Sequence, residues 1–383
     1  MKKISFSFLF LLLISMPSWA NDGVYYTSGN QLVPMQETDV SVRKEVLTIT
    51  LLDSSVALVD VYYEFFNPNA TAKTVLMGFE ADPPSGDYPQ FSWGGGHPFI
   101  GGFTVEMNGR TLSFRNGICL LGSRKLDTIT LGDKYQLDES GFIFEKATER
   151  YPDVAFVYYF DAVFQPGLNR VHHTYTFRPA NSNASSFSVD YKLTPAARWA
   201  NGQIDDFTLV VRAHHTAKHF VIADSIFPNP QFSLTEGTGK HRHTATCFWQ
   251  QPGHEFSLRN GSYTLHVRHF KPCRELSIVS ADNCLAFQDF YADHIDLPFG
   301  FAYDRSSCLG LWYQASMLPR DEAFRRRIAR NLPFAHRGRV FKSPELQKYF
   351  ESLWWYMPDP NYVDDPSDFT ECDLEYIKWG KGE

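Results

Sequence analysis

The chain has 383 residues, of which 43% are hydrophobic and 21% charged, so it can build a packed core and wholesale disorder is excluded. Its formal net charge of −7 argues against a general nucleic-acid-binding protein, which needs a cationic surface to neutralise phosphates. At roughly 100–200 residues per domain, the length allows about two or three domains. Aromatic residues make up 16% of the chain, a load that suits strands and their cross-strand pairs.

The N-terminal segment has the features of a secretory signal peptide. Two lysines follow the initial Met, an apolar stretch covers residues 6–14, and the small residues Ser18 and Ala20 stand at the positions that a signal peptidase reads. We therefore expect residues 1–20 to be removed and the mature chain to be exported, to the periplasm or outside the cell. The apolar stretch is too short to cross about 30 Å of hydrocarbon comfortably, and we expect no transmembrane segment in the mature chain.

The remaining cysteines are six, an even number that favours disulfides over free thiols in an exported chain. The sequence does not choose among the pairings that six cysteines allow, and our working set is Cys119–Cys247, Cys273–Cys284 and Cys308–Cys372. A zinc site is the alternative, which the absence of any Cys-x-x-Cys pair argues against.

Residues 41–271 have the patterns of antiparallel strands. Residues 57–65 alternate between apolar and mostly polar side chains, which predicts a strand with one buried face. The Asn108-Gly109 turn between two apolar runs predicts a hairpin. Further strands are predicted over 154–164, 168–177, 187–193, 207–213, 232–235 and 263–269. Such short strands predict an antiparallel β-sandwich architecture, as two packed units of roughly 120 residues each.

Helical patterning replaces strand patterning near the C-terminus. Residues 321–337 carry apolar side chains at helical spacing, Pro333 is expected to end or kink that helix, and Gly338 suits its C-terminal cap. Ser343 and Pro344 form a good N-cap and first turn for a second helix.

The predicted fold class is therefore mainly β, with a small C-terminal α-helical module. The β-rich region is expected to cover residues 21–275, and the helical module residues 283–383. The change of pattern after Pro272 places the boundary.

A run of residues within the helical module carries a family pattern. It consists of Arg330-Asn331, then Phe334-Ala335-His336-Arg337-Gly338, then Phe341, then Leu346-x-x-Tyr349-Phe350, and finally Trp355-Tyr356-x-Pro358. The order and spacing resemble the YARHG domain, a small module of exported bacterial proteins whose molecular function is unknown. Phe334 stands where the family has Tyr, His336-Arg337 reverses the family's Arg-His order, and Pro333 stands where an aliphatic residue is usual.

Three shorter pieces of the β-rich region also resemble a family. They are Asn21-Asp22-Gly23, the segment 158–179, and Trp199-x-Asn201-Gly202-x-Ile204-x-x-Phe207. They are similar to an uncharacterised family of exported bacterial β-rich proteins, and that resemblance implies no activity.

Histidines are the main candidates for metal ligands. His241-x-His243 presents two imidazoles on one strand face about 7 Å apart, and a site needs a third ligand. His254 lies beyond a Gln-Pro-Gly turn at the far end of the predicted hairpin, and at about 3.3 Å per residue we expect it some 30 Å away. We therefore predict no metal site, and we expect His173 to be a buried, hydrogen-bonded core residue.

Motifs of covalent catalysis do not stand out. The chain contains no Gly-x-Ser-x-Gly elbow and no His-Glu-x-x-His motif. Carboxylate pairs such as Asp205-Asp206 exist, but a glycosidase needs two carboxylates across a cleft, which spacing in the sequence does not show. We predict no catalytic residue and no cofactor.

Charge is segregated within the helical module. Residues 320–342 hold seven Arg and one Lys against two acidic residues, a net of +6, whereas residues 359–375 hold seven acidic residues and neither Lys nor Arg. We expect the acidic tail to dock on the basic helix; the alternative is an open anion-binding face. That candidate binding face consists of Arg326, Arg330, His336, Arg337, Trp354, Trp355 and Tyr356.

The leading hypothesis is a non-catalytic exported bacterial protein of unknown molecular function that acts in binding or envelope interaction. Its expected partner is an anionic cell-envelope polymer or another envelope protein, and no nucleic acid. The alternative is a hydrolase acting on cell-envelope polymers, with the C-terminal module as its targeting device.

Overall fold

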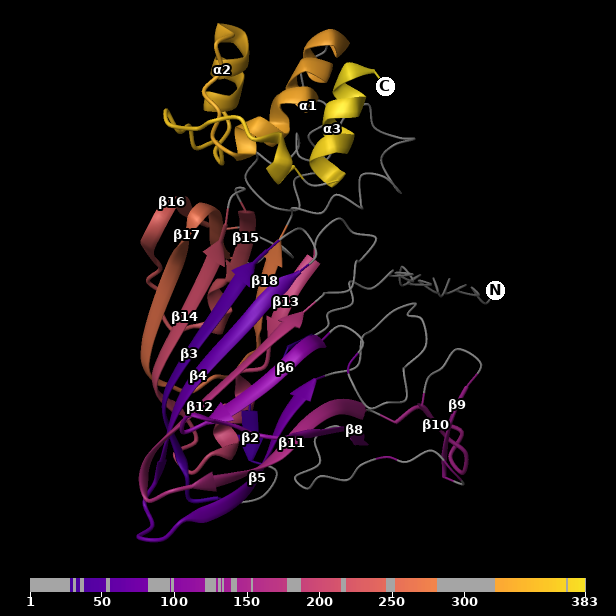
Figure 1. The fold of residues 1–383 in the computed structure, drawn as a ribbon, viewed down its shortest axis with the longest axis vertical. Coiled ribbons are helices and arrows are strands. Elements are labelled where there is room, and N and C mark those ends of the chain that lie inside the picture. The colour runs from indigo at the N-terminus through magenta and orange to yellow at the C-terminus, as the bar shows by residue number, and fades with distance from the viewer. Residues whose placement is uncertain are drawn as a thin grey trace, which may run out of the picture.

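The computed structural model shows a mainly β fold with a small helical module at the C-terminal end (Figure 1). It describes residues 28–29, 32–34, 38–52, 56–81, 97, 100–120, 129, 132, 134–138, 143–152, 154–177, 187–214, 218–245, 252–280, 321–369 and 371–382. The expected signal peptide lies outside these residues. None of the helices within them is long and apolar enough to cross a membrane.

A 12-stranded sheet forms the larger layer of the β-rich part, in the order β1-β13-β18-β15-β17-β14-β3-β4-β12-β6-β7, with β16 paired to β17. Its strands are β1 (Ser28–Gly29), β3 (Ser41–Leu51), β4 (Ala57–Asn67), β6 (Ile100–Met107), β7 (Arg110–Thr111), β12 (Gly167–Phe177), β13 (Phe187–Tyr191), β14 (Ile204–Ala213), β15 (Lys218–Ala223), β16 (Ser233–Thr244), β17 (Gly253–Phe270) and β18 (Leu276–Ser280). Most neighbours are antiparallel, but β3 pairs with β14 in parallel. One sheet therefore joins strands from both halves of the β-rich region.

A four-stranded sheet, in the order β2-β5-β11-β8, forms the second layer. Its strands are β2 (Leu32–Pro34), β5 (Lys73–Ala81), β8 (Arg115–Leu120) and β11 (Val154–Phe164); β9 (Tyr135–Leu137) and β10 (Ile143–Glu145) pair separately. The chain passes from β11 to β12, and so from one sheet to the other, through a short turn at Gly167, whose φ of +83° suits glycine. The predicted β-sandwich architecture is confirmed.

Local sequence signals place the strands well. Every second residue of β4 is buried, as the alternation predicted. Asn108 and Gly109 have φ angles of 52° and 79°, which are typical of a type I′ hairpin turn. Whether the β-rich part divides into two folding units, and whether the helical module folds on its own from about residue 283, stay predictions.

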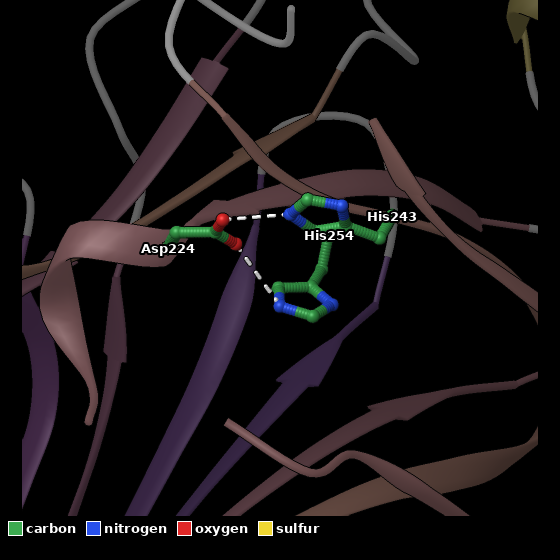
Figure 2. A group of neighbouring side chains, drawn as sticks. All are labelled: Asp224, His243 and His254. Carbon is green, nitrogen blue, oxygen red and sulfur yellow. Dashed lines mark hydrogen bonds and ion pairs between the residues drawn. The ribbon is translucent and has the colours of Figure 1, made fainter. Parts of the chain in front are cut away.

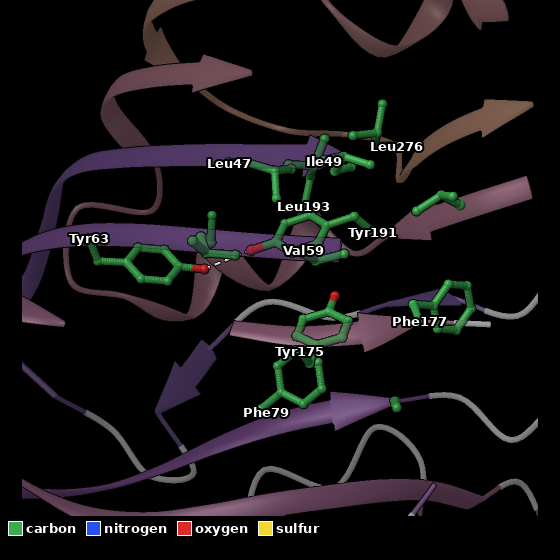
Figure 3. Packing of buried hydrophobic residues seen from close by; sticks show 14 of the residues in the cluster. Leu47, Ile49, Val59, Tyr63, Phe79, Tyr175, Phe177, Tyr191, Leu193 and Leu276 are labelled. Atoms are coloured by element: carbon green, nitrogen blue, oxygen red, sulfur yellow. Dashed lines mark hydrogen bonds between the residues drawn. The ribbon is translucent and has the colours of Figure 1, made fainter. Parts of the chain in front are cut away.

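The core between the two sheets combines aliphatic side chains with many aromatic rings (Figure 3). Phe79 of the small sheet lies 4.9 Å from Tyr175 of the large sheet, centroid to centroid, in an edge contact. Phe65 and Phe164 meet in the same way at 5.5 Å. Each such edge contact contributes about 0.5–1.5 kcal/mol beyond the burial of its area. Many of the chain's aromatic residues, which make up 16% of the sequence, thus stabilise the contact between the two sheets.

Polar side chains are also buried in this core, namely the hydrogen-bonded group of Glu45, Tyr63 and Tyr191, and His173. Tyr191 donates a hydrogen bond to Glu45 at 3.0 Å, and its hydroxyl lies 2.7 Å from that of Tyr63. His173 is fully buried, as expected, and stacks on Tyr63. The expectation that His173 is hydrogen-bonded is not met within the described part of the chain, because neither of its ring nitrogens has a partner there. Burial lowers the pKa of His173 to about 3.

His173 is predicted to make the protein acid-labile. An unfolded histidine takes up a proton near pH 6.5, whereas the buried ring stays neutral until about pH 3. Its contribution to stability is thus complete above pH 6.5 and is lost as the pH falls toward 3. His173→Phe should reduce the pH dependence of the unfolding free energy between about pH 6 and pH 4 by up to about 1.4 kcal/mol per pH unit, measured by urea denaturation.

The matched control is His172→Phe on the opposite face of the same strand, where the side chain is 43% exposed and lies 3.1 Å from Asp60. An equal reduction of the slope in both variants would contradict the assignment to burial.

The helical module has its own small core. It contains α1 (Glu322–His336), α2 (Pro344–Glu351), the short 3₁₀ helix η8 (Pro366–Asp368) and α3 (Glu371–Lys381). Of the two expected effects of Pro333, ending or kinking the helix, the first is wrong, since α1 continues to His336. Residues that follow the helix hydrogen-bond to carbonyls of its last turn. The Arg337 guanidinium donates to the Pro333 carbonyl at 2.9 Å, and the Arg339 amide donates to the Phe334 carbonyl at 3.0 Å.

Candidate functional site

Strand β17 has two buried faces at its N-terminal half, and each contacts a different part of the molecule. His254 and Phe256 point to one face, and Glu255, Ser257 and Arg259 point to the other, because successive side chains alternate across a strand. We call the segment formed by β15, β16 and the N-terminal half of β17 the ribbon. Figure 1 shows the helical module beyond the end of the ribbon.

The helical module sits on the ribbon through Trp355. Ser257 donates from its hydroxyl to the Trp355 carbonyl at 3.2 Å. The rings of His219 from β15 and of His336 from α1 lie 5.5 Å and 4.6 Å from the Trp355 ring. Trp355 is almost fully buried. It lies at the centre of the interface between the helical module and the ribbon, and we call this interface, formed around Trp355 by His219, Ser257 and His336, the seam.

Charged side chains flank the same seam. Arg242 of β16 forms an ion pair with the buried Glu255, and its guanidinium lies 4.4 Å from the ring centre of Trp354. At the other side, Arg259 is buried and its guanidinium fills the space beside Gly338, where a Cβ would lie 1.9 Å from Nη1. The predicted helix end at Gly338 therefore also provides the close approach between the module and the ribbon.

The residues predicted as an anion-binding face do not form one surface. Arg337, Trp355 and Tyr356 are buried, Arg326, His336 and Trp354 are half-buried, and Arg330 is exposed. Trp355 and Tyr356 therefore offer no stacking platform to a polymer in this structure. The physical reason is that a small module needs large apolar side chains to fill its core, and Trp354, Trp355 and Tyr356 pack in or against that core.

Arg337 holds the acidic tail against the basic helix. Its guanidinium donates to Asp373 of α3 at 2.8 Å and lies over the ring of Phe369 at 4.5 Å. A second pair joins Arg339 to Asp364 at 3.1 Å. A Cβ on Gly380 would lie 2.6 Å from the α1 backbone, which shows how closely α3 approaches. The expected docking of the tail is thus present.

The buried pair is predicted to matter far more than an exposed one of the same length. Asp373→Asn removes the carboxylate that pairs with the buried Arg337 and should destabilise the module by about 3–5 kcal/mol. Glu345→Gln removes a pair with Arg327, also 2.8 Å long, but with side chains 60% and 40% exposed, and should change stability by about 0–1 kcal/mol. Thermal unfolding of both variants measures the difference; equal shifts would contradict the role given to Arg337.

The other face of the ribbon brings together three histidines and one aspartate. His243 lies directly opposite His254 in the register of β16 with β17, and His241 lies opposite Phe256. The expected 30 Å separation of His254 from the other two is therefore wrong. Thr244, the last residue of β16, pairs with Gly253, the first residue of β17, so His243 and His254 lie at the same end of the strand pair.

Asp224 completes the cluster, and the sequence analysis missed it. It follows β15, whose last residue Ala223 pairs with Gly253, and its amide donates to the Pro252 carbonyl at 3.1 Å. It begins the short 3₁₀ helix η2 (Asp224–Ile226). The register of β15 on β17 brings the Asp224 carboxylate close to His254. No motif in the sequence around Asp224 indicates that it lies near the histidines.

Asp224 contacts both histidines of the hairpin end (Figure 2). Oδ2 lies 2.6 Å from His243 Nε2, with the geometry of a hydrogen bond. Oδ1 lies 3.1 Å from His254 Nε2, but it is buried and receives no hydrogen bond from the described residues. Asp224 Oδ1 therefore lies close to His254 Nε2 but receives no hydrogen bond from it.

The ring of His254 is held in a fixed orientation. Its Nδ1 lies 2.8 Å from His241 Nε2, and the two rings stack at 5.0 Å. His241 stacks in turn on Phe256, at 4.7 Å and nearly parallel. Burial lowers the pKa of His254 and lowers that of His241 to about 4. Both rings are therefore neutral at neutral pH and keep a lone pair.

The predicted disulfides lie partly outside the described residues. Each pair includes at least one such cysteine, namely Cys247, Cys284 or Cys308. Cys119 is buried on β8, and Cys273 is exposed after β17. The pairing stays a prediction.

The expected family match is confirmed for the C-terminal part: residues 312–381 match the family model of the YARHG domain. No curated protein matches the chain. Among solved structures, the chain is similar to a protein from Legionella pneumophila subsp. pneumophila str. Philadelphia 1, described as a candidate nutrient binding protein, with a TM-score of 0.51 and 18% identity over 93% of this chain and 98% of that chain. At that identity, the likeness shows the fold alone.

A weaker likeness exists to an M1 zinc metallopeptidase from Deinococcus radiodurans, with a TM-score of 0.27 and 12% identity over 65% of this chain and 43% of that chain. This chain therefore spans less than half of that enzyme, and the likeness carries no functional argument. The fold and the comparisons together show a β-sandwich part that carries a C-terminal YARHG domain.

Proposed function

We propose that this chain is an exported, non-catalytic binding protein whose ligand site is the cluster of Asp224, His241, His243 and His254. The observation that carries the proposal is the arrangement of this cluster, which offers neutral imidazoles and a carboxylate oxygen that receives no hydrogen bond within the described part of the chain. The likeness to a protein described as a candidate nutrient binding protein supports binding as the activity.

The alternative, hydrolysis of an envelope polymer, needs a general base directed at the bond or at an attacking water. The nearest strand neighbour with a carboxylate is Glu255, and its side chain lies on the opposite face of β17, paired with Arg242. It therefore points to the helical module and away from the cluster. Glu255 is therefore not available as the general base, and only the histidines and Asp224 of the cluster itself could take that role.

Binding without turnover is the expected result with the purified full chain. Its melting temperature should rise with at least one member of a panel of amino acids, short peptides, monosaccharides and divalent cations, because a ligand that binds only the folded state stabilises it by about 2.7 kcal/mol at 100 times its Kd. Peptidoglycan sacculi should release no soluble fragments. Catalytic release of fragments, or a melting temperature unchanged by every member of the panel, would contradict the proposal.

A further inference from the structure

We propose that Asp224, His243 and His254 bind a divalent transition-metal ion, with His241 as the residue that positions His254. This inference rests on the proposed function and names the ligand class of that site. Within the described part of the chain, these three are the residues whose potential ligand atoms gather at metal-binding distance, all within 4.8 Å of one another.

The chemistry of the three ligands selects the class of ion. Two imidazole nitrogens and one carboxylate oxygen suit Zn²⁺ and its first-row neighbours, whereas Mg²⁺ and Ca²⁺ prefer sites built from oxygen alone. Three protein ligands leave a further coordination position for water or for a ligand group. The site is therefore an open one, which fits a protein that binds its ligand reversibly.

The spacing fits such an ion after small movements. A tetrahedral Zn²⁺ with Zn–N distances of about 2.0–2.1 Å holds its ligand atoms about 3.3 Å apart. The His254 to Asp224 distance of 3.1 Å is close to that value, and the His243 to Asp224 distance is 2.6 Å. The His243 side chain is 54% exposed, so its ring has room on the solvent side to turn outward.

The carboxylate oxygen supplies the second argument. Asp224 Oδ1 is buried without a hydrogen bond from the described residues, which costs about 1–3 kcal/mol or more for a charged group. A cation placed between Oδ1 and His254 Nε2 would satisfy both atoms at once.

His241 provides the outer contact that metal-bound histidines usually make. When Nε2 of His254 binds the ion, the ring proton sits on Nδ1, which lies 2.8 Å from His241 Nε2. His241 Nε2 accepts this proton's hydrogen bond when the ring proton of His241 sits on its own Nδ1. Such outer partners orient the ligand and change metal affinity by about 10–100-fold.

The test is titration of the full chain, freed of metal by a chelator, with Zn²⁺ in a calorimeter at neutral pH. We expect saturable binding of about one ion per chain, and none of Mg²⁺ or Ca²⁺ at the same concentrations. His254→Gln and Asp224→Asn should each weaken Zn²⁺ binding at least about 100-fold. His241→Phe, which keeps the ring stack but removes the acceptor, should weaken it about 10-fold.

His266→Gln is the matched control, since His266 and Asp206 form an exposed pair at 2.8 Å on the same sheet, and no third potential ligand joins them among the residues that the structure describes. It should leave the Zn²⁺ affinity unchanged. X-ray absorption of the wild-type complex gives a readout that needs no variant: two imidazoles should coordinate the ion at about 2.0–2.1 Å.

Absence of saturable Zn²⁺ binding by the wild-type chain, or equal loss in His266→Gln and His254→Gln, would overturn the metal site. The proposed function would then still stand if another solute of the panel raised the melting temperature without turnover. Conversely, release of fragments from sacculi by a chain that binds Zn²⁺ would overturn the non-catalytic function and leave the metal site intact.

Discussion

The alternation of side chains along β17 is the constraint on which the rest of the structure depends. One strand hydrogen-bonds to β14, β15 and β16, so its position fixes three neighbours at once. Its odd-numbered residues Ser257 and Arg259 reach the helical module, and its even-numbered residues His254 and Phe256 reach the histidine cluster. A slip of one residue would exchange the two faces, so docking and the candidate metal site depend on a single register.

Two glycines help to set that register. Gly237 has a φ of +74°, and a Cβ there would lie 2.0 Å from the Asn260 carbonyl oxygen. A Cβ on Gly261 would lie 1.9 Å from the Glu236 carbonyl oxygen. The pairing of β16 with β17 shifts on both sides of Glu236. Only glycine permits this close approach, so the β-bulge around Glu236 has to lie beside Gly261. This fixes the register of β16 on β17, which places His243 opposite His254.

Local signals predicted the elements of the fold but not the relations among them. The alternation of β4 and the Asn108-Gly109 turn depend on neighbours in the chain, and both were predicted correctly. The position of His254 depends on a bulged register, and that of Asp224 depends on a different strand, so neither followed from spacing. Burial of Trp355 could not be distinguished from a stacking platform, because both use the same residue type and differ only in what packs above the ring.

The signature of the YARHG domain in this chain encodes packing rather than an open polar face. Arg337 joins α1 to the tail through Asp373, while its neighbour His336 points to Trp355 at the seam with the ribbon. Gly338, with a φ of +93°, ends α1 and leaves room for Arg259 of β17. Three successive residues of the signature thus have three packing roles. His336 contacts Trp355 at the seam, Arg337 binds α3 within the module, and Gly338 leaves space for the Arg259 side chain of the β-rich part. A change at these positions would first loosen the seating of the module on β17, whose opposite face carries His254.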